Sequence, residues 1–176
     1  MDINTDAKIL LDADVIIHFI KGGRIGTLPE IFPNKLYLLD IVFDEVFAKS
    51  SNRAEVENMI TLGFFNELKL DDEGSEVKRE YYWLTGTSGG NRGKGESAVM
   101  AYCRYHNDVL ASSNLKDIKD YCKEHEIVYL TTMDFLAKAF RQLIMTENEC
   151  DDFIKTVKAK GSHLMKGVDR IRDYRR

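Results

Sequence analysis

The sequence has few of the residues that restrict a chain or staple it together. Proline occurs only twice, as Pro29 and Pro33, so most of the chain is free to form regular helices and strands. The three cysteines are an odd number and form no CxxC motif, which argues against a disulfide framework and favours a reducing compartment. No apolar run approaches the length that spans a bilayer, and the N-terminus lacks the layout of a signal peptide. We therefore expect a cytoplasmic protein without a membrane segment.

The composition is that of an ordinary globular domain. Of the 176 residues, 44% are hydrophobic and 31% are charged, which excludes the disordered, collagen-like and fibrous classes. The length suits one domain with a substantial core. We expect residues 1–150 to form this domain, and residues 151–176 to form a C-terminal helix and basic tail that packs on it or extends it.

The net charge of −4 does not by itself indicate nucleic-acid binding, but the charge is unevenly distributed. The segment 151–176 carries eight Lys or Arg and four Asp, whereas the rest of the chain is acidic. Two interpretations of this segment are open: a solvated C-terminal helix, or an arm that contacts phosphates or a partner.

Short apolar runs alternate with helical patterns along the chain. Strands are expected at residues 8–12, 35–39, 64–70, 109–111 and 127–130. Helices are expected at residues 14–21, 41–49, 53–62, 75–84, 96–106, 115–125, 133–145 and 149–160, with a glycine-rich loop at 86–95. Such alternation favours right-handed crossovers between parallel strands. We therefore predict an α/β protein: a single-domain, three-layer α/β/α sandwich with a central, mostly parallel sheet of four or five strands.

Acidic and polar side chains follow the predicted strands. Those near the first two strands and the glycine-rich loop are Asp12, Asp14, Glu45 and Glu96. Those after the last two strands are Ser112, Ser113, Asn114, Asp117, Thr131, Thr132 and Asp134. Because the carboxyl ends of parallel strands meet at one edge of a sheet, we expect these groups to lie close together there.

A cluster of carboxylates at such an edge favours a hard divalent cation. Mg²⁺ takes oxygen ligands, and packed carboxylates repel one another without a cation. A bound ion lowers the pKa of a water and neutralises charge on a phosphodiester. Taken singly, Glu45, Glu96 and Asp134 are better explained as surface acids or as groups at helix N-termini. Asp12 differs, because it follows a fully apolar strand and is costly to bury unpaired.

Two segments in the first third of the chain combine an apolar stretch with an acid. Residues 9–16 (ILLDADVI) have a run of apolar residues, then Asp12, then a small residue and a polar one. Residues 39–47 (LDIVFDEVF) carry Glu45 on a predicted helix.

Two later segments place an acid at the start of a helix. Residues 95–101 (GESAVMA) carry Glu96, and residues 110–118 (LASSNLKDI) carry Asp117 after a strand-to-helix turn. In their order and spacing, the four segments together resemble the PIN-domain nucleases, a family that includes the toxins of many bacterial toxin–antitoxin pairs. Each motif is short, but the resemblance covers most of residues 8–145.

The resemblance implies an α/β/α nuclease that cleaves RNA with Mg²⁺ or Mn²⁺. Asp12 and Asp117 would be the primary metal ligands, with Glu96 bound directly or through a water. Glu45 would complete the catalytic set by orienting the attacking water or by holding a second ion. The same resemblance makes RNA the expected substrate, and an antitoxin protein and a homodimer the expected associations.

Further residues are expected to support these acids or to bind the substrate. The supporting residues are Asp14, Ser112, Ser113, Asn114 and Asp134. Arg92, Lys94 and Lys116 are candidates for phosphate contacts, which supply most nucleic-acid affinity, although such charges are more often ordinary solvated surface groups.

Two points allow alternative interpretations. The turn after the fourth strand can be aligned so that the fourth acid is Asp117, which we prefer, or so that the acidic positions fall on Ser113 and Asn114. The second alignment would make the chain a non-catalytic PIN-like module that binds RNA or a protein partner. The aromatic run at residues 81–83 (YYW) either stacks on bases or packs as a helix face on the sheet.

Overall fold

The computed structural model describes residues 3–47 and 52–175 and contains a five-stranded sheet. Its strands are β1 (Ile9–Leu11), β2 (Leu36–Leu39), β3 (Phe65–Leu68), β4 (Val109–Ala111) and β5 (Tyr129–Leu130). They are ordered β3-β2-β1-β4-β5, and every neighbouring pair is parallel. The prediction of a parallel sheet is therefore confirmed.

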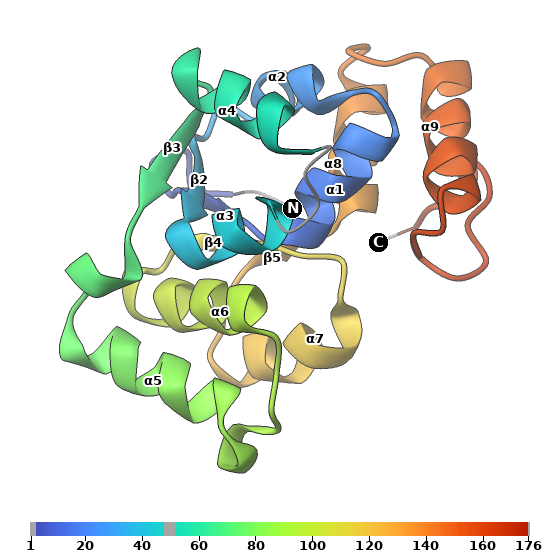
Figure 1. The fold of residues 1–176 in the computed structure, drawn as a ribbon. Coiled ribbons are helices and arrows are strands. Elements are labelled where there is room, and N and C mark those ends of the chain that lie inside the picture. The colour runs from blue at the N-terminus through green and yellow to red at the C-terminus, as the bar shows by residue number, and fades with distance from the viewer. Residues whose placement is uncertain (1–2, 48–51, 176) are drawn as a thin grey trace.

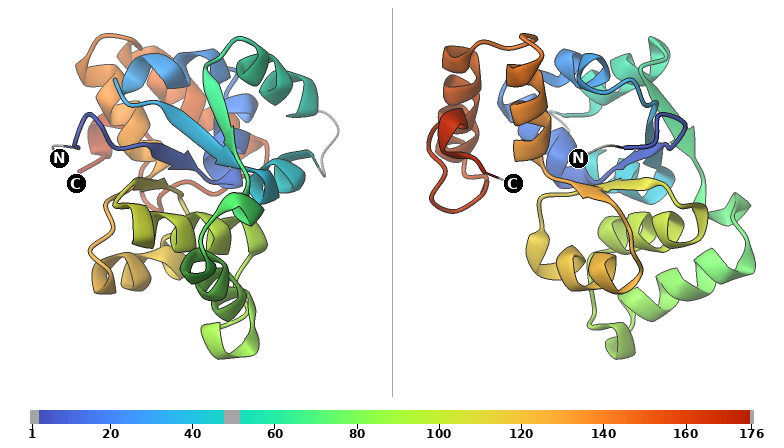
Figure 2. Two further views of the ribbon diagram at one scale, coloured as in Figure 1. Left: turned by 90° about the vertical axis from the view of Figure 1, so that its left-hand side faces the viewer. Right: turned by 180° about the vertical axis from the view of Figure 1, so that it is seen from behind.

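Helices cover both faces of this sheet (Figures 1 and 2). They are α1 (Ala13–Lys21), α2 (Leu28–Ile31), α3 (Asp40–Phe47), α4 (Arg53–Thr61), α5 (Ser75–Thr85), α6 (Lys94–His106), α7 (Leu115–Glu124), α8 (Thr132–Arg141) and α9 (Glu147–Ala159). α1, α2 and α8 lie on one face and α6 and α7 on the other, with α5 outside α6 and α9 outside α1 and α8. The predicted three-layer α/β/α sandwich is confirmed.

The two central strands consist of apolar residues with no polar alternation. All three residues of β1 are fully buried, and so are Leu110 and Ala111 of β4. A strand that is covered by helices on both faces has no solvated side, so every position favours an apolar residue. The short apolar runs that predicted these strands are therefore the direct consequence of a three-layer fold.

Some element boundaries differ from those predicted from the sequence. The chain forms α2 around Pro29, a helix that the prediction lacked, because proline is accepted in the first turn of a helix. α9 begins two residues earlier than predicted, where Thr146 and Glu149 form a capping box. The helix predicted for residues 41–49 is described as far as Phe47, and its last two residues lie outside the described part of the chain.

The C-terminal segment packs on the face formed by α1 and α8. The ring of Phe153 on α9 lies 5.0 Å from that of Phe19 on α1, centroid to centroid. Gly22 is packed so closely that a Cβ atom there would lie 2.2 Å from the Phe153 ring. Ile171 and Tyr174, beyond α9, are also buried in the common core. In the described ranges, no helix is long and apolar enough to cross a membrane.

Candidate functional site

The strand order reverses between β1 and β4, which makes the carboxyl ends of these two strands the switch point of the sheet. From β1 the chain moves outward to β2 and β3, and then crosses back to β4 on the other side of β1. Ligands of parallel α/β sheets bind at such a reversal of strand order. The backbone N–H of Asp12 donates to the carbonyl of Ala111 at 2.9 Å, so the two strand ends remain together up to this point.

Asp12 is the first acid at this switch point and the N-cap of α1. Its Oδ1 accepts a hydrogen bond from the Ala13 N–H at 2.8 Å, and only 5% of the residue is exposed. Burial raises the pKa of Asp12 well above its ordinary value, and the carboxylates of Asp14 and Glu96 raise it further. The N-cap role fixes the side chain, while the like charges around it make its ionised form costly.

Asp14, in the first turn of α1, is held by the end of β4. Its Oδ2 accepts hydrogen bonds from the Ser113 N–H at 2.8 Å and from the Ser112 hydroxyl at 3.4 Å. Its Oδ1 is buried and has no hydrogen-bond partner among the described residues. Burial raises the pKa of Asp14 to about 6, against these hydrogen bonds, which lower it.

Glu96, in the first turn of α6, is the third acid of the cluster and is 6% exposed. Burial, followed by the charges of Asp117 and Asp14, raises the pKa of Glu96 to about 8. Its Oε1 is a second buried carboxylate oxygen without a hydrogen-bond partner in the part of the chain that is described. Glu96 is therefore a largely buried acid with other acids as its near neighbours.

Glu45 reaches the same helix from α3. Its Oε1 accepts a hydrogen bond from the Gly95 N–H at 2.7 Å, which satisfies one of the free donors at the start of α6. A Cβ atom on Gly95 would lie 2.5 Å from Glu45 Oε2, so the contact depends on glycine. Glu45 is itself exposed, in contrast to the buried Asp12 and Glu96.

Asp117 reaches the cluster from the first turn of α7. The side-chain amide of Asn114 donates to its Oδ2 at 2.7 Å. Its charge is the first among those that raise the pKa of Glu96. In the turn before α7, the Ser113 N–H donates to Asp14 and the Asn114 side chain donates to Asp117.

The donor set fits a hard cation, although the side chains do not form a finished cage. Four acids, Asp12, Asp14, Glu96 and Asp117, act on one another electrostatically, and two of their oxygens are buried without a hydrogen-bond partner among the described residues. Mg²⁺ and Mn²⁺ prefer such carboxylate oxygens. Across the described residues, however, no group of three or more His, Cys, Asp or Glu side chains is arranged to hold a metal ion.

Asp134 does not join the cluster, contrary to the expected supporting role. Its Oδ2 accepts from the N–H of Thr131 at 2.7 Å and from the hydroxyl of the same residue, which forms the capping box of α8. Its Oδ1 accepts from the Tyr174 hydroxyl at 2.7 Å. Both carboxylate oxygens are therefore engaged in holding α8 and the C-terminal segment.

The three candidate phosphate-binding residues lie in different settings. Arg92 donates to the Gly89 carbonyl, and its positive charge opposes the rise in the pKa of Glu96. Lys94 and Lys116 are exposed, near the starts of α6 and α7. Of the three residues, Arg92 is thus the one whose charge acts on an acid of the cluster, Glu96.

Behind Asp14 lies a buried hydrogen-bond network that the sequence did not predict. The Ser113 hydroxyl donates to the Thr132 hydroxyl at 2.8 Å, and Thr132 lies 2.9 Å from Nδ1 of His18. Burial lowers the pKa of His18 to about 4, so its ring is neutral at pH 7. The only sequence signal was a histidine on the apolar face of α1, which by itself indicates no particular partner.

Comparisons with known proteins give no family assignment. No protein-family model and no curated protein sequence matches this chain.

Proposed function

We propose that this protein is a PIN-type ribonuclease that cleaves phosphodiester bonds in RNA with Mg²⁺ or Mn²⁺ and acts in the cytoplasm. The observation that carries the proposal is the convergence of acids from α1, α6 and α7 at the reversal of strand order, with two buried carboxylate oxygens left without partners. The acids of the cluster repel one another, and a divalent cation would supply opposing positive charge to the carboxylate oxygens.

Asp12, Glu96 and Asp117 are the residues that would hold the ion. A bound Mg²⁺ or Mn²⁺ would lower the pKa of a water and neutralise charge on the phosphodiester. Asn114 fixes the carboxylate of Asp117, and the end of β4 fixes Asp14 beside Asp12. These contacts hold the acids on rigid elements, so that their charges act at a fixed place relative to the substrate.

Glu45 has a positioning role in this proposal, in addition to its expected role at the attacking water. Through its bond to the Gly95 N–H it sets where α6 begins, and thereby where Glu96 emerges. Its Oε2 makes no hydrogen bond to any described residue and is left to accept one from a water.

Calorimetric titration of the metal-free protein with Mn²⁺ tests the proposed site. We expect the wild type to bind Mn²⁺ and Asp12→Asn to bind it more than about tenfold more weakly. Asn keeps the oxygen that accepts from the Ala13 N–H, so the variant should fold. Asp44→Asn, at an exposed acid next to Glu45, is the matched control and should bind like the wild type. Absence of binding by the folded wild type would leave a non-catalytic PIN-like module as the better proposal.

A further inference from the structure

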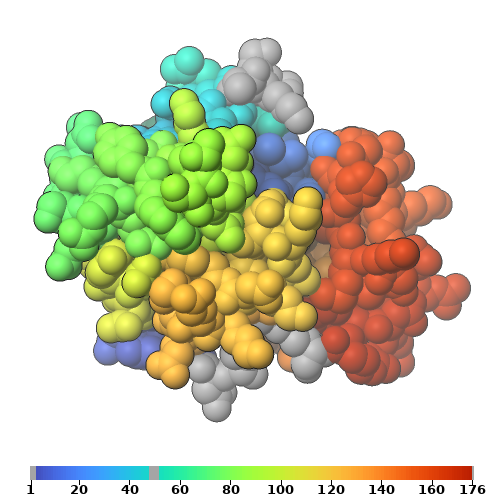
Figure 3. Space-filling view, turned by 90° about the horizontal axis from the view of Figure 1, so that it is seen from below, coloured from blue at the N-terminus to red at the C-terminus, as the bar shows by residue number. Residues whose placement is uncertain are grey.

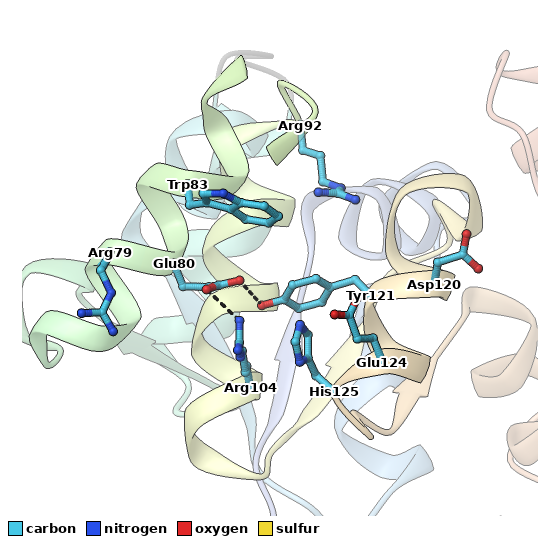
Figure 4. A pocket seen from close by; sticks show the side chains of 9 residues that line it. All are labelled: Arg79, Glu80, Trp83, Arg92, Arg104, Asp120, Tyr121, Glu124 and His125. Carbon is cyan, nitrogen blue, oxygen red and sulfur yellow. Dashed lines mark hydrogen bonds and ion pairs between the residues drawn. The ribbon is translucent and has the colours of Figure 1, made fainter. Parts of the chain in front are cut away.

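Outside the acid cluster, a cavity of about 400 Å³ lies between α5, α6 and α7 (Figure 4). This volume lies in the range of small-molecule sites. α5 contributes Trp83, α6 contributes Arg104, and α7 contributes Tyr121. On the face seen in Figure 3, α5 and the loop after it, in green, lie beside α7, in yellow and orange.

The floor of the cavity is fixed by an ion-pair network. Glu80 accepts from the Tyr121 hydroxyl at 2.8 Å and pairs with the guanidinium of Arg104 at 2.7 Å. Only 11% of the Glu80 side chain is exposed. The network therefore joins the three helices that form the walls of the cavity.

An aromatic face and two guanidinium groups surround this floor. Trp83 is 49% exposed and makes no aromatic or cation–π contact to any described residue. Figure 4 shows its ring above the cavity, with Arg79 on one side and Arg92 on the other. Arg79 is exposed, with no ion pair or hydrogen bond to other described residues. An unpartnered indole flanked by cations is the arrangement on which the bases of a single strand stack while their phosphates are neutralised.

The acids of the cavity make a base, rather than a phosphate, the group that fits its centre. Asp120 and Glu124 line the side formed by α7, where a phosphate would be repelled. A carboxylate there accepts a hydrogen bond from the amino group of a base, which is how proteins read the exposed edges of single-stranded RNA. Figure 4 shows Arg79 and Arg92 on opposite sides of the Trp83 ring, in keeping with a nucleotide whose flanking phosphates face these two residues.

The cavity and the acid cluster share one residue, Arg92. Arg92 belongs to both, because it lines the cavity and its charge acts on Glu96. Tyr121 follows Asp117 by about one turn of α7, a rise of about 6 Å along the helix axis. Successive phosphates of a helical strand are ~3.4 Å apart along its axis, so this distance corresponds to about two nucleotides. A strand bound at the acids would therefore reach the cavity within a few nucleotides.

We propose that this cavity is a subsite for one unpaired base of a single-stranded RNA, which stacks on Trp83 a short distance from the acid cluster. The inference rests on the proposed function, since it takes RNA as the substrate. It makes the substrate single-stranded, because the faces of paired bases are covered by their neighbours in a duplex.

Trp83 is the only tryptophan of the chain, so its fluorescence reports on this cavity alone. Titration of the protein in EDTA with a short oligoadenylate should quench this fluorescence to saturation, and the same strand annealed to its complement should not. Adenine suits the test because it stacks well and carries an amino group. Arg79→Ala, which keeps the tryptophan, should weaken the apparent affinity several-fold.

Calorimetry with the same oligoadenylate supplies the matched pair of variants. Trp83→Leu should lose about five- to a hundredfold in affinity. Tyr82→Leu, at an exposed aromatic on the same helix that does not line the cavity, should bind like the wild type. Binding by Trp83→Leu at wild-type strength would overturn the subsite.

The fluorescence experiment also separates the failure of the subsite from failure of the proposed function. Fluorescence that saturating oligoadenylate leaves unchanged would overturn the subsite, even if the protein cleaves RNA, and would leave a protein side chain as the better occupant. Quenching by a protein that binds no Mn²⁺ and cleaves no RNA would support the subsite and contradict the proposed nuclease activity.

Discussion

At the scale of single residues, the candidate site buries carboxyl groups whose ionised forms are better solvated in water. Asp12 and Glu96 are almost completely buried, yet the charges nearest to them are mostly negative. Burial and like charges both favour the protonated form of a carboxyl group. The folded chain therefore holds protons at these positions that the unfolded chain would release, and its stability must depend on pH.

The metal-free protein should lose stability at these acids as the pH rises. The pKa of Glu96 is raised from 4.5 to about 8, and that of Asp14 from 3.8 to about 6. A raised carboxyl pKa stabilises the fold fully below the unfolded value, and this contribution is lost as the pH rises through the folded value. Glu96→Gln cannot ionise, so in urea unfolding with EDTA it should gain on the wild type between pH 5 and pH 8. Glu67→Gln, at an exposed acid of β3, should show no such gain. If the free energy of unfolding of Glu96→Gln changed with pH in the same way as that of the wild type, Glu96 could not be a buried acid surrounded by other carboxylates.

At the scale of elements, the start of α6 decides where Glu96 lies. The loop before α6 packs on the end of α5, where Arg92 N–H donates to the Leu84 carbonyl at 3.2 Å. Within this loop, Gly89 lies directly against the backbone of Trp83. By these backbone contacts, the loop links the end of α5, which carries Trp83, to the first turn of α6.

Gly89→Ala should disturb this link. The added Cβ would lie 2.1 Å from the Trp83 carbonyl oxygen and 2.6 Å from the Leu84 Cα, and neither backbone atom can rotate away. We expect a loss of about 1–3 kcal/mol in the free energy of unfolding, measured by urea denaturation. Gly26→Ala, where a Cβ would meet nothing within 4 Å, serves as the control and should cost much less. Equal stabilities of the two variants would show that the loop does not depend on this contact.

The elements and the first acid could be predicted from the sequence, because both depend on local pattern. A short apolar run that ends in an acid predicted β1 and the buried position of Asp12. The partners of the other acids could not be predicted in this way. Glu45 bonds to a helix start 50 residues away, and Asp134 bonds to Tyr174 across 40 residues. Such contacts depend on how elements pack in three dimensions, which no local periodicity records.

At the scale of the whole molecule, the C-terminal segment shares the core of the sheet domain. Phe153 packs between Phe19 and Gly22 of the first βα unit and is fully buried. The Tyr174 hydroxyl then bonds to Asp134, on the helix that follows β5. The chain should therefore unfold as one unit, with no separate transition for its last helix.

Phe153→Ala tests this unity. Removal of a buried aromatic ring should cost about 3–5 kcal/mol, and unfolding should remain a single transition by fluorescence and circular dichroism. Leu62→Ala, at a side chain that is 66% exposed, is the control and should change stability little. An early, separate loss of helix in Phe153→Ala, with the remaining transition at wild-type stability, would indicate an independent C-terminal unit.

The measurement that tests the central claim most directly is cleavage of a labelled single-stranded RNA by the purified protein. The reaction is run with Mg²⁺, with Mn²⁺ and with EDTA, beside Asp12→Asn at the same concentration. We expect cleavage that requires a divalent cation and falls to background in Asp12→Asn, because the buried acid at the end of β1 is placed to hold the ion. Cleavage that persists in EDTA, or that Asp12→Asn retains at the wild-type rate, would contradict the assignment of the acid cluster as a metal-dependent nuclease site.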